Sequence, residues 1–198
     1  MTLILASHSA SRQAMLAAAG VPFQAVPSHA DEAAMKAALQ AEGASGRTLA
    51  DALAELKALR VAARHPDALV LGSDSLLVRD DGVLLDKPVD RDDAAAQLRA
   101  LSGKRHQLVS AAVIVEAGRP VWRFVDSARL TVRSLSDNFI DTYLDAEWPA
   151  IADCVGCFRI EGLGVQLFDR VDGSHFTILG MPLLPVLDYL RLREKILS

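Results

Sequence analysis

Short apolar runs alternate with helix-like segments along the whole chain, and this alternation constrains the fold more than any other feature. Leu3–Ala6 and Ala68–Gly72 are continuous apolar runs, a pattern typical of strands buried on both faces. Each run is followed by a polar loop. The spacing of apolar residues, with capping residues at the ends, predicts helices at 12–19, 48–64 (capped by Thr48), 91–101, 136–146 and 183–196.

Two antiparallel hairpins are expected among the remaining strands. Residues 76–79 and 83–85 flank a turn that contains Asp81-Gly82, and residues 107–116 and 121–133 flank a second turn. Further strands are expected at 21–26, at 158–168, where Gly162 and Gly164 indicate a bulge or a close approach, and at 176–179. The Ala-rich segment 31–46 is expected to be weakly helical or mobile. The pattern predicts an α/β domain with a mixed, twisted sheet flanked by helices.

Composition excludes several classes of protein. The chain has 198 residues, 51% of them hydrophobic, with a net charge of −4. This hydrophobicity argues against disorder, and the length favours a single domain over residues 1–198. The slight acidity argues against a nucleic acid polymer as partner, because such binding needs a basic surface. No apolar stretch approaches the ~18 residues of a membrane span. The N-terminus has no basic residue before Arg12 and therefore does not resemble a signal peptide. We expect a cytoplasmic protein.

The first candidate site is the polar loop that contains Ser7, Ser9, Ser11 and Arg12. It lies between a predicted strand and a predicted helix, so backbone N–H groups and the positive end of the helix dipole meet there. Hydroxyl groups and a guanidinium suit phosphate oxygens. The alternative is an ordinary serine-rich helix cap, and the sequence G-x-x-x-x-G-K-[ST] of a P-loop is absent.

Two further polar clusters are expected at strand ends. Asp74 follows the apolar run 68–72, where a carboxylate could bind Mg²⁺ or act as a general base; the alternative is a solvated turn aspartate. Lys87 precedes Pro88 and is expected to extend from a strand end. Lys57 lies within a largely apolar predicted helix and could reach a site. Taken alone, each lysine is explained equally well as a surface charge.

Cys154 and Cys157 are the two cysteines of the chain and form a C-x-x-C. A redox dithiol is one interpretation and half of a zinc site is another. No second cysteine pair accompanies them, and the pair lies late in the chain, unlike a thioredoxin-type motif. We favour the interpretation that both are small buried residues.

The order and spacing of these clusters resemble the Maf family over about residues 3–190. The segments that carry the resemblance are Ala6-Ser7-x-Ser9-x-x-Arg12, Asp31-Glu32, Leu53-Ala54-x-x-Lys57-Ala58, Gly72-Ser73-Asp74, Lys87-Pro88, Leu101-Ser102-Gly103, Glu161-Gly162-x-Gly164 and Gly180-Met181-Pro182-Leu183. The resemblance implies an inosine-triphosphatase-like fold, hydrolysis of a nucleoside triphosphate to the monophosphate and pyrophosphate, a divalent metal cation (Mg²⁺ or Mn²⁺) and a homodimer.

The resemblance also implies roles for particular residues. Asp74 matches the catalytic aspartate, and Glu32 matches an acidic residue associated with the metal and with catalysis. Matches at the phosphate site are Ser7, Ser9, Arg12, Lys57 and Lys87. The mechanism expected on this basis has Asp74, with Glu32, hold the metal and activate a water for in-line attack on the α-phosphorus.

Three positions expected to select the base are Ser11, Ser75 and Glu161. The segment around Glu161 is more similar to the 7-methyl-GTP type than to the dTTP/UTP type, and a carboxylate suits the N–H donors of a guanine edge. Ser11 and Ser75 match neither type. We therefore expect 7-methyl-GTP or another modified nucleotide as substrate. The alternatives are a dTTP/UTP pyrophosphatase and a non-enzymatic nucleotide-binding regulator of cell division.

Overall fold

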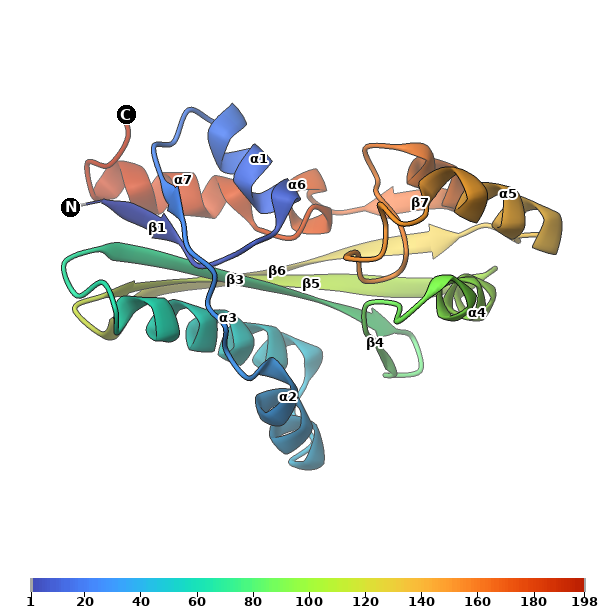
Figure 1. The fold of residues 1–198 in the computed structure, drawn as a ribbon, viewed down its shortest axis with the longest axis horizontal. Helices are drawn as coiled ribbons and strands as arrows, with labels where there is room; N and C mark the ends of the chain where they lie inside the picture. Colours follow the sequence, from blue (N-terminus) through green and yellow to red (C-terminus); the bar gives the residue numbers. More distant parts are fainter. Residues whose placement is uncertain (1, 198) are drawn as a thin grey trace.

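The computed structural model describes residues 2–197, which form a sheet between two layers of helices (Figure 1). The elements are β1 (Leu3–Leu5), α1 (Ala10–Ala18), β2 (Gln24–Ala25), α2 (Glu32–Ala41), α3 (Gly46–Ala62), β3 (Leu69–Arg79), β4 (Leu84–Leu85), α4 (Arg91–Leu101), β5 (Arg105–Glu116), β6 (Arg119–Val132), α5 (Asp137–Glu147), the 3₁₀ helix η1 (Leu163–Leu167), β7 (Phe168–Asp172), α6 (His175–Ile178) and α7 (Leu183–Leu192).

The sheet is mixed, as the sequence predicts. Its strand order is β2-β1-β3-β5-β6-β7, with β4 paired to the far part of β3. β1 runs parallel to β2 and β3, whereas β3, β5, β6 and β7 pair antiparallel in turn. In Figure 1, α3 covers one face of the sheet, and α1 and α7 cover the other. The expected α/β class with a helix-flanked mixed sheet is confirmed.

The alternation of side chains along the buried strands builds the two cores beside the site. Leu5 and Leu71 point toward α1 and α7, while Ile4 and Val70 point toward α3 and contact the cluster around Leu53. All five side chains are almost fully buried, and burial of each contributes about 1.5–3 kcal/mol to stability. Because both faces of β1 and β3 are covered, their sequences are apolar throughout rather than alternating.

Gly72 sets how closely α3 packs on the sheet. A Cβ at this position would lie 2.1 Å from the carbonyl oxygen of Ala54 and 2.8 Å from the backbone nitrogen of Ala58, so only glycine allows this approach. Asp74 lies two residues further along β3 and therefore on the same face, and Lys57 lies on the adjoining turn of α3. The close contact at Gly72 thus brings Lys57 up to Asp74.

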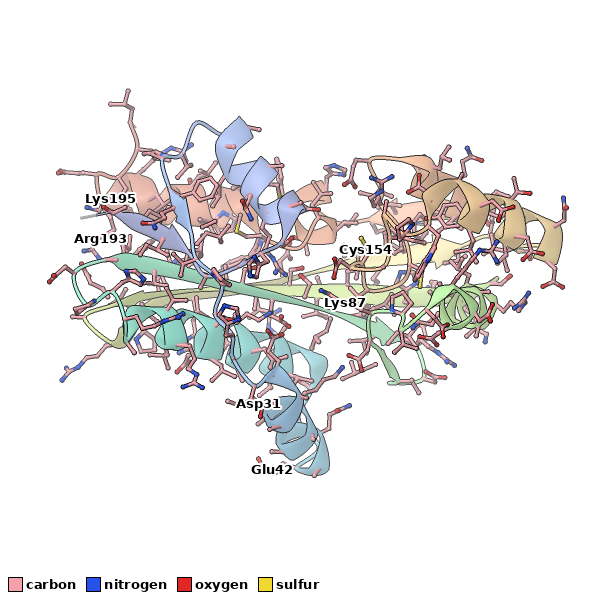
Figure 2. The ribbon with its side chains drawn as sticks, viewed as in Figure 1. Asp31, Glu42, Lys87, Cys154, Arg193 and Lys195 are labelled. Carbon is pink, nitrogen blue, oxygen red and sulfur yellow. The ribbon has the colours of Figure 1, made fainter. Side chains whose placement is uncertain are left out.

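Two predictions for the first half of the chain differ from the structure. α3 begins at Gly46, because the hydroxyl of Ser45, not Thr48, caps it by accepting from the Thr48 N–H at 3.1 Å. Segment 31–46 contains a regular helix, α2, capped by Asp31. α2 has no buried residue, and Figure 2 shows it projecting from the sheet between Asp31 and Glu42. Low burial explains its weak sequence signal.

Two predicted strands near the end of the chain were also wrong. Segment 158–168 begins with turns and η1, and a strand starts only at Phe168. Segment 176–179 belongs to α6, a single helical turn that lies between two glycines of positive φ, Gly173 and Gly180. A short apolar run is compatible with a strand or with one buried helical turn, so periodicity could not separate them. Among residues 2–197, no helix is both long and apolar enough to traverse a bilayer.

Candidate functional site

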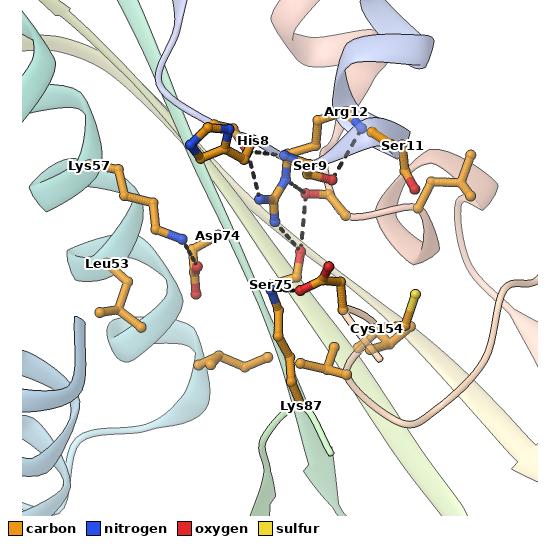
Figure 3. A pocket seen from close by; sticks show the side chains of 18 of the residues that line it. His8, Ser9, Ser11, Arg12, Leu53, Lys57, Asp74, Ser75, Lys87 and Cys154 are labelled. Atoms are coloured by element: carbon orange, nitrogen blue, oxygen red, sulfur yellow. Dashed lines mark hydrogen bonds and ion pairs between the residues drawn. The ribbon is translucent and has the colours of Figure 1, made fainter. Parts of the chain in front are cut away.

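A cavity of about 1050 Å³ lies beside the end of β1. Its wall includes every residue that the sequence analysis assigned to a site: Ser7, Ser9, Ser11, Arg12, Glu32, Lys57, Asp74, Ser75, Lys87 and Glu161. Figure 3 shows the serine loop and Arg12 on one side, Lys57 and Asp74 on another, and Lys87 and Cys154 below Ser75. The fold therefore gathers residues that are up to 154 positions apart, from Ser7 to Glu161, around one space.

The cavity opens where β1 stops. β1 pairs with Leu69–Leu71 of β3, and β3 then continues to Arg79 without β1 beside it. Asp74 is therefore in the middle of an 11-residue strand, paired with Ala111 of β5, and not in a loop at a strand end as predicted. The apolar pattern breaks here because Asp74 and Ser75 line the cavity and Ser73 donates to the Ala111 and Gly180 carbonyls. The alternative of a solvated turn aspartate is wrong, since Asp74 is 6% exposed.

Arg12 is buried and forms a hydrogen-bond network with the serine loop. Ser9 caps α1 and accepts from the Arg12 N–H. The Arg12 side chain donates from Nε to the Gly180 carbonyl at 2.8 Å, from Nη2 to Ser75 Oγ at 3.0 Å and from Nη1 to Ser7 Oγ at 3.4 Å. Burial lowers the pKa of Arg12, whereas the charges of Asp74 and Glu32 act in the opposite direction. Arg12 is thus a fixed buried cation rather than a mobile surface charge.

Lys57 joins the two predicted acidic residues. Its Nζ lies 2.6 Å from Oδ1 of Asp74 and 2.9 Å from Oε2 of Glu32, the first residue of α2. Burial raises the pKa of Asp74, and the charges of Lys57 and Arg12 partly oppose the rise. A carboxyl group with a raised pKa beside a cavity is a recognised feature of general bases.

The donor set near Asp74 accommodates a divalent cation only with help from a ligand. Within residues 2–197 no group of three or more His, Cys, Asp or Glu side chains could hold a metal ion. Asp74 and Glu32 supply two carboxylates on either side of Lys57. Two carboxylates completed by phosphate oxygens and waters match the way in which Mg²⁺ is usually bound. The residues present therefore fit a metal that arrives with a phosphate group.

Lys87 lies in the loop after β4 and pairs with Asp153 at 3.2 Å, with both side chains largely exposed. A second ion pair, which the sequence analysis did not anticipate, joins Lys36 of α2 to Asp86. All four residues line the cavity, so both pairs link the segments around it. The Lys87–Asp153 pair is exposed on both sides, so it contributes little to stability and the Lys87 charge remains available to an anionic ligand.

The environment of the two cysteines favours packing over redox chemistry. Cys157 is fully buried, its Sγ lies 3.5 Å from Gln97 Oε1, and burial raises its pKa to about 12. Burial also raises the pKa of Cys154, which lies on the cavity wall. Reactive thiols of C-x-x-C motifs have lowered pKa values, so the environment argues against the oxidoreductase interpretation.

The predicted base-selecting residues lie at different parts of the wall. Ser75 is joined to Arg12, to the Gly180 carbonyl and to Ser110 at 2.8–3.0 Å, so its hydroxyl is engaged within the protein. Glu161 is exposed. Arg159, two residues earlier in the chain, also lines the cavity and was not identified from the sequence. Its closeness in sequence to Glu161 was the one signal that could have identified it.

A family model described as "Maf-like protein" matches residues 2–193. The nucleoside triphosphate pyrophosphatase of Sphingopyxis alaskensis is 51% identical over 191 residues, which cover 96% of each chain. Nucleoside triphosphate pyrophosphatase 1 of a Jannaschia species is 49% identical over 194 residues, covering 98% of each. A solved nucleoside-triphosphatase (dITP/XTP pyrophosphatase) from Mycobacterium abscessus, with 19% identity, 67% and 73% coverage and a TM-score of 0.36, is too distant to support a conclusion.

Proposed function

Because the chain belongs to the Maf family and is a nucleoside triphosphate pyrophosphatase, we propose that its preferred substrate carries a modified purine of the 7-methyl-GTP type. The reaction converts the triphosphate and water into the monophosphate and pyrophosphate. The observation that carries the proposal is a single cavity with a buried Asp74 between two cations at one part of its wall and Glu161 at another. A cytoplasmic homodimer remains a prediction.

Asp74 is proposed as the general base. Water attacks the α-phosphorus, its proton passes to the Asp74 carboxylate, and the bond from the α-phosphorus to the bridging oxygen breaks. The pyrophosphate leaves with the electron pair of that bond. Support for this role comes from the burial of Asp74 and from the direction of its pKa shift. The contact with Lys57 keeps the carboxyl group ionised enough to accept a proton.

The cations of the wall are proposed to hold the phosphates. Arg12 is fixed by three hydrogen bonds, so its positive charge is placed before a ligand arrives. Ser7 and Ser9 add hydroxyl groups at the N-terminus of α1. Lys87 can exchange its exposed partner Asp153 for a phosphate oxygen, and Lys57 can share its charge between the carboxylates and a phosphate.

A divalent cation, Mg²⁺ or Mn²⁺, is proposed to be held by Asp74 and Glu32 together with the substrate phosphates. When bound, the cation supplies charge neutralisation for the phosphates. Lys57 lies between the two carboxylates, so it limits their mutual repulsion when the cation is absent.

The test is an assay of pyrophosphate release from ATP, GTP, 7-methyl-GTP, dTTP and UTP with Mg²⁺ or Mn²⁺. We expect the highest kcat/KM for 7-methyl-GTP, and highest turnover of dTTP or UTP would overturn the base preference. Asp74→Asn should lower kcat by about 10²–10⁴-fold, because loss of a general base has this effect. An exposed carboxylate outside the cavity, Asp188, provides the control Asp188→Asn. Absence of turnover with every nucleotide would favour the regulator, and full activity of Asp74→Asn would reject its role.

A further inference from the structure

A buried carboxylate holds an arginine at the part of the cavity wall that the proposed mechanism does not use. Arg159 donates from Nε at 2.9 Å and from Nη2 at 2.8 Å to the same oxygen, Oε2 of Glu147. Glu147 is the last residue of α5, and its side chain is 5% exposed. The Arg159 side chain is 41% exposed and lines the cavity. Glu147 therefore fixes a guanidinium at the edge of the open space.

The two glycines of Glu161-Gly162-x-Gly164 fold the chain back over Arg159. A Cβ at Gly164 would lie 2.4 Å from the Arg159 carbonyl oxygen and 2.8 Å from its backbone nitrogen, which no other residue permits. A Cβ at Gly162 would lie 3.7 Å from Glu147 Oε1 and 3.9 Å from Arg159 Nη2. This reversal of the chain places Glu161 on the same wall as Arg159. The hydrogen bond and charge of Glu147 raise the pKa of Arg159 most, and the charge of Glu161 adds to the rise.

The hydrogen-bonding capacity of this wall is incomplete within the protein. A guanidinium has five N–H donors, and Glu147 receives two of them. Among residues 2–197, Arg159 Nη1 has no hydrogen-bond partner within the protein, and Glu161 is exposed and can only accept when ionised. A donor and a two-oxygen acceptor therefore both lie on the wall of the cavity.

We propose that Arg159 is a specificity-determining residue that donates to O6 of a guanine while Glu161 accepts from N1–H and the N2 amino group. A guanine edge presents one acceptor followed by two donors, which complements this pair. Adenine would direct its 6-amino donor at the guanidinium, and uracil or thymine would direct its O2 acceptor at the carboxylate. A methyl group at N7 leaves the edge unchanged. The inference rests on the proposed function and assigns the residue that selects the base within it.

The experiment compares kcat/KM for GTP, for 6-thio-GTP, in which a weakly accepting sulfur replaces O6, and for ITP, which lacks the N2 amino group. The wild type should prefer GTP over either analogue by about tenfold or more, because one bidentate base contact is worth 10- to 100-fold. Arg159→Met should abolish the preference over 6-thio-GTP and retain the preference over ITP. Glu161→Ala should lose the preference over ITP.

Variants of this pair need a control for folding, because Arg159→Met leaves Glu147 buried without its partner. The double variant Glu147→Gln/Arg159→Met removes both charges and should give the same ratios, while Arg159→Lys should keep part of the O6 preference. Arg133→Met removes an arginine that contacts the Gln166 carbonyl outside the cavity and should change no ratio. Each ratio compares two substrates on one protein, so loss of folded material cancels.

Binding of GMP and 6-thio-GMP, measured by calorimetry, gives the same comparison without turnover. An unchanged GTP preference over 6-thio-GTP in both Arg159→Met and the double variant would overturn the inference and leave the pyrophosphatase function intact. A wild type that hydrolyses no triphosphate would overturn the proposed function, and the binding ratio would still decide on Arg159.

Discussion

The Nζ of Lys57 lies 2.6 Å from Oδ1 of Asp74, and both side chains are about nine-tenths buried. The pair exists because Gly72 lets α3 approach β3 to within a distance that no Cβ could tolerate. Lys57 also contacts Glu32 at 2.9 Å, so one ammonium serves two carboxylates. The small size of Gly72 therefore determines how close the buried Lys57 comes to Asp74, the proposed base.

Replacement of Lys57 should change the pH at which the enzyme loses activity in acid. The Lys57 charge lowers the pKa of Asp74, so its removal in Lys57→Met raises that pKa further. Protonated Asp74 cannot accept a proton from water, and the acid limb of the kcat profile should therefore move to higher pH. The measurement is kcat against pH from 4 to 9.

Lys36→Met is the matched control for that experiment, because Lys36 lines the same cavity but pairs with Asp86. Its acid limb should coincide with that of the wild type. If the limb of Lys57→Met also stays in place while KM rises, Lys57 acts on the substrate phosphates and not on Asp74.

Gly72→Ala should uncouple α3 from the sheet. The new methyl group would meet backbone atoms of Ala54 and Ala58, which cannot move without the helix. We expect a loss of about 1–3 kcal/mol in the free energy of unfolding, together with a fall in kcat per folded molecule because Lys57 moves with α3. Urea denaturation and an active-site-normalised assay measure the two effects.

Gly20→Ala is the control for Gly72→Ala, because it introduces backbone strain without changing the packing around the site. Gly20 has φ +69° and open space around it, so alanine there is strained but touches nothing. Its stability should fall with kcat unchanged. Unaltered kcat in Gly72→Ala would mean that the α3 contact does not position Lys57.

The local sequence was sufficient for the sheet class but not for the site. Asp74 was chosen as a candidate and lines the cavity, yet it was predicted to lie in a loop because Gly72-Ser73-Asp74-Ser75 breaks an apolar run. The apolar run breaks where β1 ends, and β1 lies 65 or more residues before this segment in the sequence. The segment stays in a strand only because it pairs with β5. Glu32 was identified by family resemblance alone. Lys57 was noticed because it lies in a largely apolar helix, but only the resemblance assigned it to the phosphate site.

The errors near the end of the chain have a similar cause. Gly162 and Gly164 were interpreted as a bulge or a close approach within a strand. The close approach is confirmed at Gly164, which contacts the backbone of Arg159, but the segment is not a strand. Glycine marks close approach in either case, and its partner cannot be known from the local sequence. Arg159 was missed for the same reason, because its anchor Glu147 lies 12 residues earlier on a helix.

Ser75→Ala should weaken substrate binding through Arg12. The Ser75 hydroxyl accepts from Arg12 Nη2 and lies 3.0 Å from the Gly180 carbonyl, so its removal loosens the guanidinium. One hydrogen bond is worth about 0.5–1.5 kcal/mol, which predicts a rise in KM of up to about tenfold for every triphosphate alike. Steady-state kinetics with GTP and UTP provide the measurement.

The control for Ser75 is Ser110→Ala, which removes a hydroxyl that bonds to Ser75 and to the Thr177 carbonyl but not to Arg12. It should lower stability with little effect on KM. A Ser75→Ala enzyme that changes its preference between bases, with KM for its best substrate unchanged, would instead place Ser75 among the base-selecting residues.

His106 should make the fold sensitive to acid. It lies on β5, fully buried between Phe158 and Phe168, and neither ring nitrogen has a hydrogen-bond partner among the residues that the structure describes. Burial lowers its pKa from 6.5 to about 4, with the charge of Asp80 opposing the shift. Below pH 6.5, His106 therefore binds a proton in the unfolded chain, whereas in the folded chain it stays neutral until about pH 4. The free energy of unfolding should fall across this window by about 3 kcal/mol.

His106→Leu removes both the titrating group and two unpartnered buried nitrogens. Its free energy of unfolding, measured by urea denaturation, should vary less with pH between 6.5 and 4 than that of the wild type. It should also be higher at pH 5, because the folded state no longer excludes a proton that the unfolded state binds. The exposed His175 gives the control His175→Gln, whose pH dependence should match the wild type. Equal slopes for His106→Leu and the wild type would show that carboxylates, and not the buried imidazole, govern unfolding in acid.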